Sequence, residues 1–447
     1  MGTSDNMAST AYLDPDSMSR SDDEEKEDDL MRTDSSNSLC QCYITNSFKH
    51  GVPIDEEVRR SLSTKQTTKL ILTKKRMKQK QWLALFHSLE SKSINRSCFT
   101  ELNFSSSNLQ VKALRVFMSI LSRASSPISN ITKLNLSGIN LHGDKGSVDL
   151  GNALIQNVHL QRLVLVNCQL DDSDLKTMQR YLLMSNNRLL KLDLSSNQIG
   201  KEGGDILGKV LKRNRFIEKL NLSWNQIRGS RGCSIMQGLM ENNNLLYFDI
   251  SFNGLGDEGA SRVGVMLEMN TTLVALNLRD NRITNEGAKS IAYGLAENKT
   301  LNSLMLSGNL ITSAGMSFIL AAVIKSESVK LRELHMKQIS PDQLCMRAIN
   351  YLQKQNKNLA IVYGEPFLSK AKTHRVDKSL VIREEIFEEI RMYLARERLR
   401  MLDLFNMWDR RKLGGIDMVD MAAGLTDCGI PVTEAILEEV FRKVDVG

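Results

Sequence analysis

The sequence is poor in the residues that mark several common protein classes. Of its 447 residues only 6 are Pro and 5% are aromatic, which excludes a collagen-like or proline-rich low-complexity chain. The longest apolar run, around Phe318 to Ile324, is less than half of the roughly 20 residues that span a bilayer. The amino terminus has no basic segment followed by an apolar one. We therefore expect neither a membrane span nor secretion.

Cysteine and histidine also show no pattern of paired or metal-binding residues. The 7 cysteines are odd in number and scattered from Cys40 to Cys428, which favours reduced thiols in an intracellular, cytoplasmic protein. A cytoskeletal or axonemal location stays open. The 6 histidines never recur at metal-ligand spacing, and no cysteine pair forms a zinc knuckle. We expect no cofactor.

Charge is distributed unevenly along the chain. The formal net charge is +7, yet residues 1–50 carry 11 acidic and 4 basic side chains. Residues 1–52 are predicted to be a disordered, acidic, Ser-rich tail because they contain too few apolar residues to form a core. Residues 53–100 are predicted to be a basic N-terminal cap with a frayed first repeat. Their basic cluster consists of Lys65, Lys69, Lys74, Lys75, Arg76, Lys78 and Lys80.

This basic cluster is compatible with several kinds of contact. Nucleic acid, an anionic membrane surface, an import receptor and the chain's own acidic tail are all possible partners of such a run. A solvated cap surface is the simpler interpretation. We expect no specific nucleic-acid partner.

A repeated motif organises the middle of the chain. The pattern Leu-x-Leu-x-x-Asn-x-Ile recurs every 28 residues, at Leu192, Leu220, Phe248, Leu276 and Leu304, and weaker copies start at Leu70, Leu102, Leu134, Leu163 and Leu334. Apolar residues at helical spacing follow each copy, as Ile291 and Leu295 do. One repeat is therefore a short strand plus a helix, and neither can bury its apolar face alone. Stacking predicts an α/β horseshoe over residues 101–365, with parallel strands inside and helices outside.

The asparagine of the motif is predicted to be structural. Its amide can bond exposed backbone where the chain leaves the strand, and losing such a bond costs about 1–3 kcal/mol. The predicted ladder consists of Asn197, Asn225, Asn253, Asn281 and Asn309, with Cys168 at the same position in an earlier repeat. Cys168 is therefore expected to be a ladder residue and not a reactive thiol.

Repeats of this length and form resemble the ribonuclease-inhibitor type of leucine-rich repeat, over about residues 66–365. That family includes nuclease inhibitors, innate-immune sensors, actin-capping proteins and the activator of the nuclear-transport GTPase. A repeat array with a helical, calcium-motif-like tail is most similar to the leucine-rich repeat-containing protein 74 group. The resemblance implies a non-enzymatic scaffold that binds a protein ligand on its concave face. GTPase activation and calcium-responsive adaptor function remain the alternatives.

Several residues are candidates for binding a partner on that face. Four consecutive strands begin with a cation, namely Lys133, Arg162, Lys191 and Lys219. Cations one strand apart, about 4.8 Å, favour an acidic ligand. The alternative is that this exposed position accepts any long polar side chain. Tyr247, Trp224 and Phe252 are predicted to form an aromatic anchor, and packing against the loop edge is its alternative.

Catalytic chemistry is not expected. Asp193 and Asp249 lie two strands apart, about 10 Å by strand spacing, so they cannot share a proton. Residues 203–209 resemble a P-loop, but Val210 replaces the Ser or Thr that binds magnesium. We therefore predict that the protein is not an enzyme.

The periodicity changes after the repeats. Residues 366–378 are predicted to be a linker, and residues 379–447 a small all-α module that begins with one helix to Trp408. Residues 409–420 resemble an EF-hand loop with Asp409, Asp417 and Asp420 as vestigial ligands, but Arg411 and Leu413 stand at positions that should supply oxygen. We predict no calcium binding by this degenerate, truncated hand. A helical cap over the last repeat is the alternative.

Overall fold

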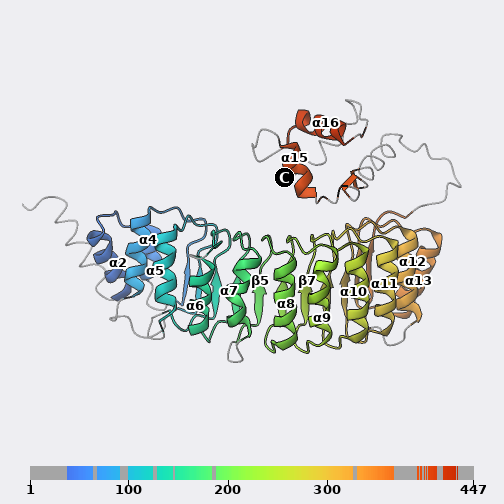
Figure 1. Cartoon of the computed structure of the whole chain (residues 1–447), viewed down its shortest axis with the longest axis horizontal. Coiled ribbons are helices and arrows are strands. Elements are labelled where there is room, and N and C mark those ends of the chain that lie inside the picture. The colour runs from blue at the N-terminus through green and yellow to red at the C-terminus, as the bar shows by residue number, and fades with distance from the viewer. Residues whose placement is uncertain are drawn as a thin grey trace, which may run out of the picture.

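The computed structural model describes residues 38–63, 68–90, 99–123, 128–143, 146–183, 188–325 and 330–366, and in the C-terminal part 390–391, 393–394, 397, 399, 401–409, 416–428 and 430. Eleven strands form one sheet in chain order, and every neighbouring pair is parallel. Helices cover one face of this elongated array (Figure 1). The predicted α/β repeat fold, with parallel strands inside and helices outside, is confirmed. No described helix is long and apolar enough to cross a membrane.

The strands are short, and the motif sets their register. They are β1 (Lys69–Ile71), β2 (Glu101–Asn103), β3 (Lys133–Asn135), β4 (Arg162–Val164), β5 (Lys191–Asp193), β6 (Lys219–Asn221), β7 (Tyr247–Asp249), β8 (Ala275–Asn277), β9 (Ser303–Met305), β10 (Glu333–Met336) and β11 (Ala360–Tyr363). The first leucine of the motif pairs with its counterpart, as Leu192 does with Leu220. Both are buried, because alternate strand residues point to opposite faces. The flanking residues therefore face away from the core.

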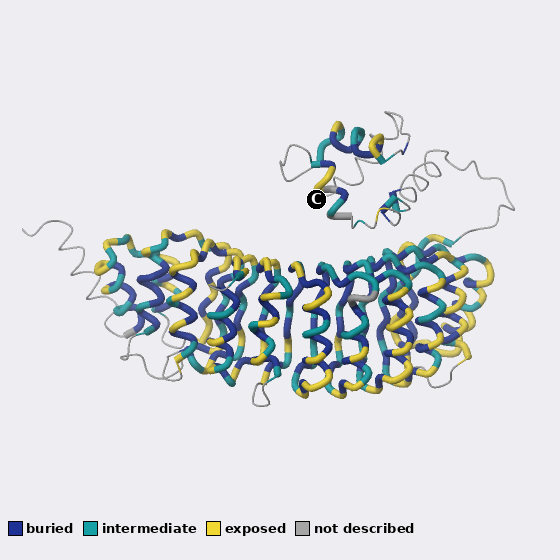
Figure 2. Tube along the Cα trace, in the orientation of Figure 1, coloured by how far each residue is buried: buried dark blue, intermediate teal, exposed yellow. Residues whose placement is uncertain are grey.

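The helices lie outside the sheet and bury one stripe each. They are α2 (Ser38–Lys49), α3 (Glu56–Ser63), α4 (Gln79–Leu89), α5 (Val111–Leu121), α6 (Ser147–Gln156), α7 (Asp172–Leu183), α8 (Lys201–Arg213), the 3-10 helix η1 (Gly229–Gly232), α9 (Cys233–Met240), α10 (Gly256–Met269), α11 (Asn285–Glu297), α12 (Ser313–Lys325) and α13 (Gln343–Gln355). Ile291 and Leu295, four residues apart in α11, are fully buried. Figure 2 shows this buried layer continuing along the array.

Glycine allows the middle helices to approach closely. A Cβ atom on Gly294 of α11 would collide with the backbone carbonyl of Gly264 in α10, which lies 30 residues earlier. Such a collision is with rigid backbone, so any larger residue would push the two helices apart. These positions set the helix spacing on the outer face.

One repeat departs from the others where the sequence breaks the pattern. Arg231 stands where neighbouring repeats have glycine at the start of the helix. There the chain forms η1, and the following helix α9 has 8 residues whereas α10 has 14. The helical part of this repeat is thus irregular.

The N-terminal boundary expected from composition is wrong. Residues 38–52 were included in the predicted disordered tail, but Ser38–Lys49 form helix α2. Tyr43 and Ile44 are fully buried in it, and Asn46 donates to Ser88 of α4 at 3.2 Å. The few apolar side chains suffice because they fall on one side of a short helix that packs against the first repeat. Residues 1–37 lie outside the described part.

The C-terminal part contains two described helices, α15 (Met401–Trp408) and α16 (Met418–Asp427). Their apolar side chains share a small core that includes Ile390, Leu394 and Trp408. Leu399 is not helical, so the single helix predicted as far as Trp408 is interrupted. The Leu399 amide bonds the Leu394 carbonyl at 2.9 Å, and the break allows both segments to contact the same core. The predicted linker after Pro366 lies outside the described residues.

Candidate functional site: a groove on the strand face

The strand face contains a hollow of about 320 Å³, called here the groove. It extends across β4 to β9. Besides the leucines and Phe248 of the strands it is lined by Arg162, Val164, Lys191, Asp193, Lys219, Asn221, Tyr247, Asp249, Ala275, Asn277 and Met305. Three of the four predicted cations and Tyr247 thus line a single concavity.

The four predicted cations differ in what they contact. Lys133 lies 3.4 Å from the Glu101 carboxylate, which is also 3.6 Å from Lys69. Lys219 Nζ lies 3.8 Å from the centre of the Tyr247 ring, a cation–π contact. Among the residues that the structure describes, Arg162 and Lys191 have no ion pair or side-chain hydrogen bond. These two exposed cations are adjacent in register.

The acidic residues of the groove have structural partners. Asp193 Oδ1 accepts bonds from the Ser195 amide at 3.0 Å and its hydroxyl at 2.6 Å. Asp249 Oδ1 does the same with Ser251, and Asn277 donates to its other oxygen at 2.8 Å. Each carboxylate therefore holds the turn that leaves its own strand. This arrangement provides fixed negative charge along the floor of the groove and does not bring two acids together.

The aromatic candidates form two groups. Trp224 and Phe252 stack on the loops between strand and helix, with ring centres 4.0 Å apart and planes at 9°. Tyr247 lies in the groove against Lys219, and among the described rings it is stacked on neither of the other two. The three-residue anchor stays a prediction, and among these three rings in the described chain the stacking contact joins only Trp224 and Phe252. The two groups differ in their position along the strands. Tyr247 is the first residue of β7, whereas Trp224 and Phe252 follow the last residues of β6 and β7.

The five predicted ladder asparagines are buried and bridge neighbouring repeats. Asn253 Nδ2 donates to the carbonyl oxygens of Leu222, Ile250 and Ser251 at 2.9–3.1 Å. Its Oδ1 accepts the Ile227 amide at 3.1 Å. Asn197, Asn225, Asn281 and Asn309 make corresponding bonds. One side chain thus satisfies backbone groups of two repeats.

Cys168 occupies the equivalent place. Its Sγ donates to the Leu136 carbonyl at 3.2 Å, 32 residues earlier, just as Asn197 donates to Leu165. Burial raises the pKa of the Cys168 thiol to about 12, so the nucleophilic thiolate is disfavoured.

A second row of asparagines was missed by the sequence analysis. Asn242 Nδ2 donates to the Leu211 carbonyl at 2.6 Å, and its Oδ1 accepts the Leu245 amide at 2.7 Å. The row consists of Asn214, Asn242, Asn270 and Asn298, and all are buried. Its signal is the 28-residue spacing from Asn214 onward. These residues connect the loops that follow the helices.

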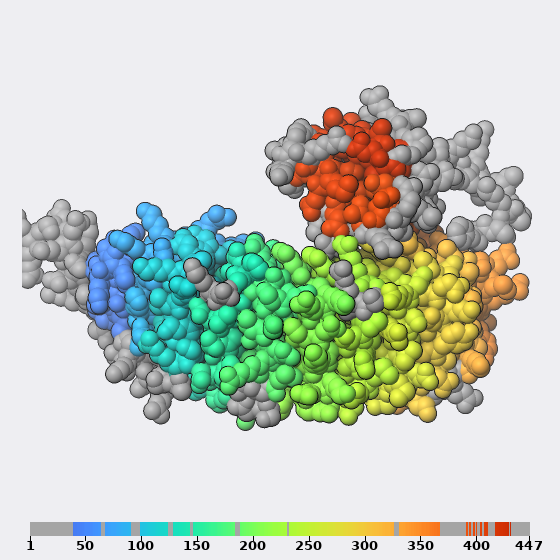
Figure 3. Space-filling view, in the orientation of Figure 1, coloured from blue at the N-terminus to red at the C-terminus, as the bar shows by residue number. Residues whose placement is uncertain are grey.

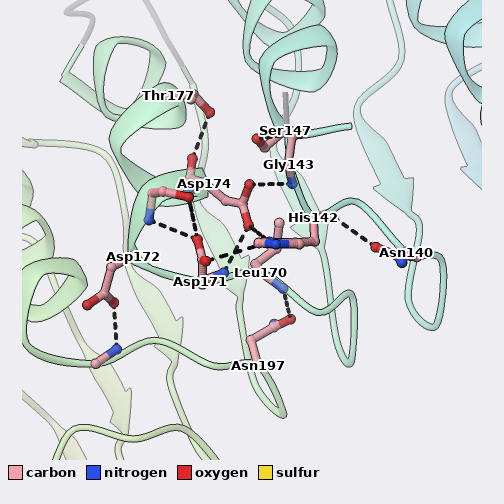
Figure 4. Close-up of polar contacts among 12 residues, drawn as sticks. Asn140, His142, Gly143, Ser147, Leu170, Asp171, Asp172, Asp174, Thr177 and Asn197 are labelled. Atoms are coloured by element: carbon pink, nitrogen blue, oxygen red, sulfur yellow. Dashed lines mark hydrogen bonds and ion pairs between the residues drawn. The ribbon is translucent and has the colours of Figure 1, made fainter. Parts of the chain in front are cut away.

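A cluster of His142, Asp171 and Asp174 was also missed (Figure 4). Among the described residues these three could offer metal-ligand atoms that lie within 4.8 Å of one another. His142 Nδ1 lies 2.9 Å from Asp174 Oδ2, whose hydrogen bond and charge raise the pKa of His142. The other Asp174 oxygen accepts the Gly143 amide at 2.9 Å. The cluster therefore ties the loop of one repeat to α7 of the next.

The EF-like residues lie only partly within the described chain. Asp417 precedes α16 and accepts the Asp420 amide at 2.8 Å, as a helix N-cap does. Asp420 is buried, and Asp409 follows α15. Residues 410–415, which include Arg411 and Leu413, lie outside the described part.

One comparison with known families identifies the repeat. A family model described as "Leucine Rich repeat" matches residues 185–207, 213–230, 241–264, 270–292 and 297–320. The chain therefore contains leucine-rich repeats. No curated protein matches at a significant level.

Three solved structures illustrate the structural likeness. Actin-binding site 2 of leiomodin-1 is 22% identical, covering 30% of this chain and 77% of its own, with a TM-score of 0.27. The tropomodulin C-terminal domain of Caenorhabditis elegans is 13% identical, covering 41% and 93%, with a TM-score of 0.28. An internalin of Listeria monocytogenes is 14% identical, covering 75% and 94%, with a TM-score of 0.42.

Proposed function

We propose that the protein is a non-enzymatic scaffold that binds an acidic segment of a protein partner in the groove. The observation that carries this proposal is the position of Arg162 and Lys191. Both are exposed, adjacent in register and without an ion pair among the described residues. They lie at the β4–β5 end of the groove, and Ala275 and Met305 line its opposite end on β8 and β9.

The electrostatics favour an anion at this place. Two cations on neighbouring strands, about 4.8 Å apart, repel each other by about 1 kcal/mol in water and more near a protein surface. A carboxylate between them relieves that repulsion. Because the groove is open to solvent, binding should weaken with salt over a Debye length of about 8 Å. The floor acids Asp193 and Asp249 add specificity, since a uniformly acidic ligand would meet them as well.

A charge reversal in the groove tests this proposal. Proteins captured by the full chain are compared with those captured by Lys191→Glu/Lys219→Glu, and by Lys201→Glu/Lys209→Glu as a control with the same charge change on exposed positions of α8. We expect the groove variant to lose a partner that the control retains. Raising the salt concentration should release the same partner from the unmodified chain. An unchanged set of partners would exclude the groove.

We also propose that the chain is related to the leucine-rich repeat-containing protein 74 group and that its tail derives from an EF-hand. Support comes from the repeat array followed by α15 and α16, with Asp417 capping α16. Titration of the whole chain with calcium checks the tail, and we expect no micromolar site because two loop positions lack oxygen ligands.

A further inference from the structure

The loops that leave the strands share an uncommon backbone conformation. The residue before each ladder position has a positive φ, at Asn167, Ser196, Trp224, Phe252, Asp280 and Gly308, with values from 51° to 72°. Glycine and short polar residues tolerate this conformation. A bulky aromatic residue there costs about 1–2 kcal/mol. Two successive repeats carry that cost at Trp224 and Phe252, which indicates a role other than folding.

The aromatic pair forms part of the edge of the array. Both residues are only half-buried, and their rings stack closely, as described above. Arg228 follows Trp224 in the same loop, and Asp280 occupies the same column one repeat after Phe252. We call these four residues the loop edge. It is separate from the strand-face groove.

The described residues of the C-terminal helical unit, between 390 and 430, form an ion pair with one end of the loop edge. Arg228 Nη2 lies 3.5 Å from Asp403 Oδ2 of α15, with 37% and 23% of the side chains exposed. At the other end, burial raises the pKa of Asp280 to about 6, and the charges of Arg279 and of Arg391 from the C-terminal unit oppose that rise. Figure 3 shows the unit resting over this part of the array.

We propose that the loop edge is a docking surface for the C-terminal helical unit of the same chain. The unit offers the acid Asp403 to Arg228, and the charge of Arg391 acts on Asp280. The aromatic pair lies between these two charges. An exposed ion pair contributes little on its own, so the proposal requires the aromatic pair to pack against the unit as well. Docking covers the loop edge, which is exposed to solvent when the unit is detached.

Zero-length cross-linking of the full chain tests the contact. The variant Arg228→Lys keeps the charge and adds an amine, and a carbodiimide joins an amine to a carboxylate, with loss of water, only when the two touch. We expect a cross-link between position 228 and Asp403 within one chain. Mixing isotope-labelled and unlabelled chains shows whether the link is intramolecular. A link between two copies would overturn the proposal, as would a yield no higher than that of the control Arg262→Lys on the exposed side of α10.

A second variant tests the aromatic pair separately from folding. In Trp224→Asn/Phe252→Asn, asparagine adopts positive φ more easily, so the thermal midpoint of the array should stay equal or rise. The yield of the 228–403 link should fall about tenfold, which corresponds to about 1.4 kcal/mol of lost contact. An unchanged yield would show that the pair does not hold the unit, and a large drop in the midpoint would show that the pair serves the array itself.

Discussion

The buried asparagines show how one side chain can satisfy several backbone groups. In Asn253 the amide nitrogen reaches three carbonyl oxygens and the amide oxygen accepts one N–H. Where strands are only three residues long, the strand ladder ends early and leaves these groups unpaired. The carboxamide takes the place of the missing ladder bonds.

Replacing Asn253 by alanine should therefore be costly. Several buried backbone groups would lose their partners, at about 1–3 kcal/mol for each that stays unsatisfied, so we expect a loss of about 2–4 kcal/mol. Thermal and urea midpoints measure it. The matched control is Asn243→Ala, at an exposed position one residue after the second asparagine row, and it should change stability by less than about 0.5 kcal/mol. Equal shifts for both variants would contradict the ladder role.

The His142 cluster should make stability depend on pH. Its pKa is raised in the folded chain by Asp174, with Asp171 adding to the effect. A raised histidine pKa stabilises the fold fully below the unfolded value of about 6.5, and this contribution is lost as pH rises through the folded pKa. The gain of wild type over His142→Asn should thus be larger at pH 6 than at pH 8, though below about 1 kcal/mol because the side chain is half exposed.

The thermal midpoint of both chains across that pH range is the measurement. His159→Asn, a change at an exposed residue of the following loop, is the control for general effects of pH. If the difference between wild type and His142→Asn were constant from pH 6 to pH 8, the protonated pair would not contribute.

At the scale of elements, the sequence predicts strands well where a following repeat exists. The register of β1 to β10 follows from the motif because each leucine must face the same core. Strand β11 was not recognised, since Ala360–Tyr363 has no asparagine after it. The physical reason is that the last repeat has no successor that needs bridging. The second asparagine row was missed because Asn298 falls inside an otherwise apolar helical series.

The ends of the chain are harder to predict because their structure depends on packing. Helix α2 has a weak apolar pattern of its own and is stabilised by contacts with α4. The break at Leu399 involves neither Gly nor Pro, and it exists because Leu394 and Trp408 share one small core. The groove cations were predictable because each begins a strand of the repeat, but the residues that they contact were not. Only the fold shows that Glu101 pairs with Lys133, whereas Arg162 has no ion pair among the described residues.

At the scale of the whole molecule, the acidic tail and the repeat array carry opposite charge. Residues 1–37 carry 11 acidic and 3 basic side chains, whereas the groove presents cations. The helix α2 that follows is part of the folded body, so a truncation that keeps all of α2 ends at residue 37. Residue 37 is followed by α2, which belongs to the same end of the array as β1.

Removing residues 1–37 should strengthen binding of an acidic ligand to the groove. The reason for this prediction is the hypothesis that the acidic tail, residues 1–37, competes for the same cations at a high local concentration and repels the ligand. We expect a labelled peptide of alternating Glu and Ser to bind about 3–10-fold more tightly to the shortened chain at about 50 mM salt, and the difference to disappear near about 300 mM, where charges are screened over a few ångströms. A chain in which residues 1–37 are replaced by a neutral Gly/Ser segment of equal length should bind the peptide as tightly as the shortened chain, because the charge of the tail and not its volume weakens binding. Introducing Lys191→Glu/Lys219→Glu in the shortened chain should abolish the gain. If the peptide bound all these chains equally, the acidic tail would have no effect on binding in the groove.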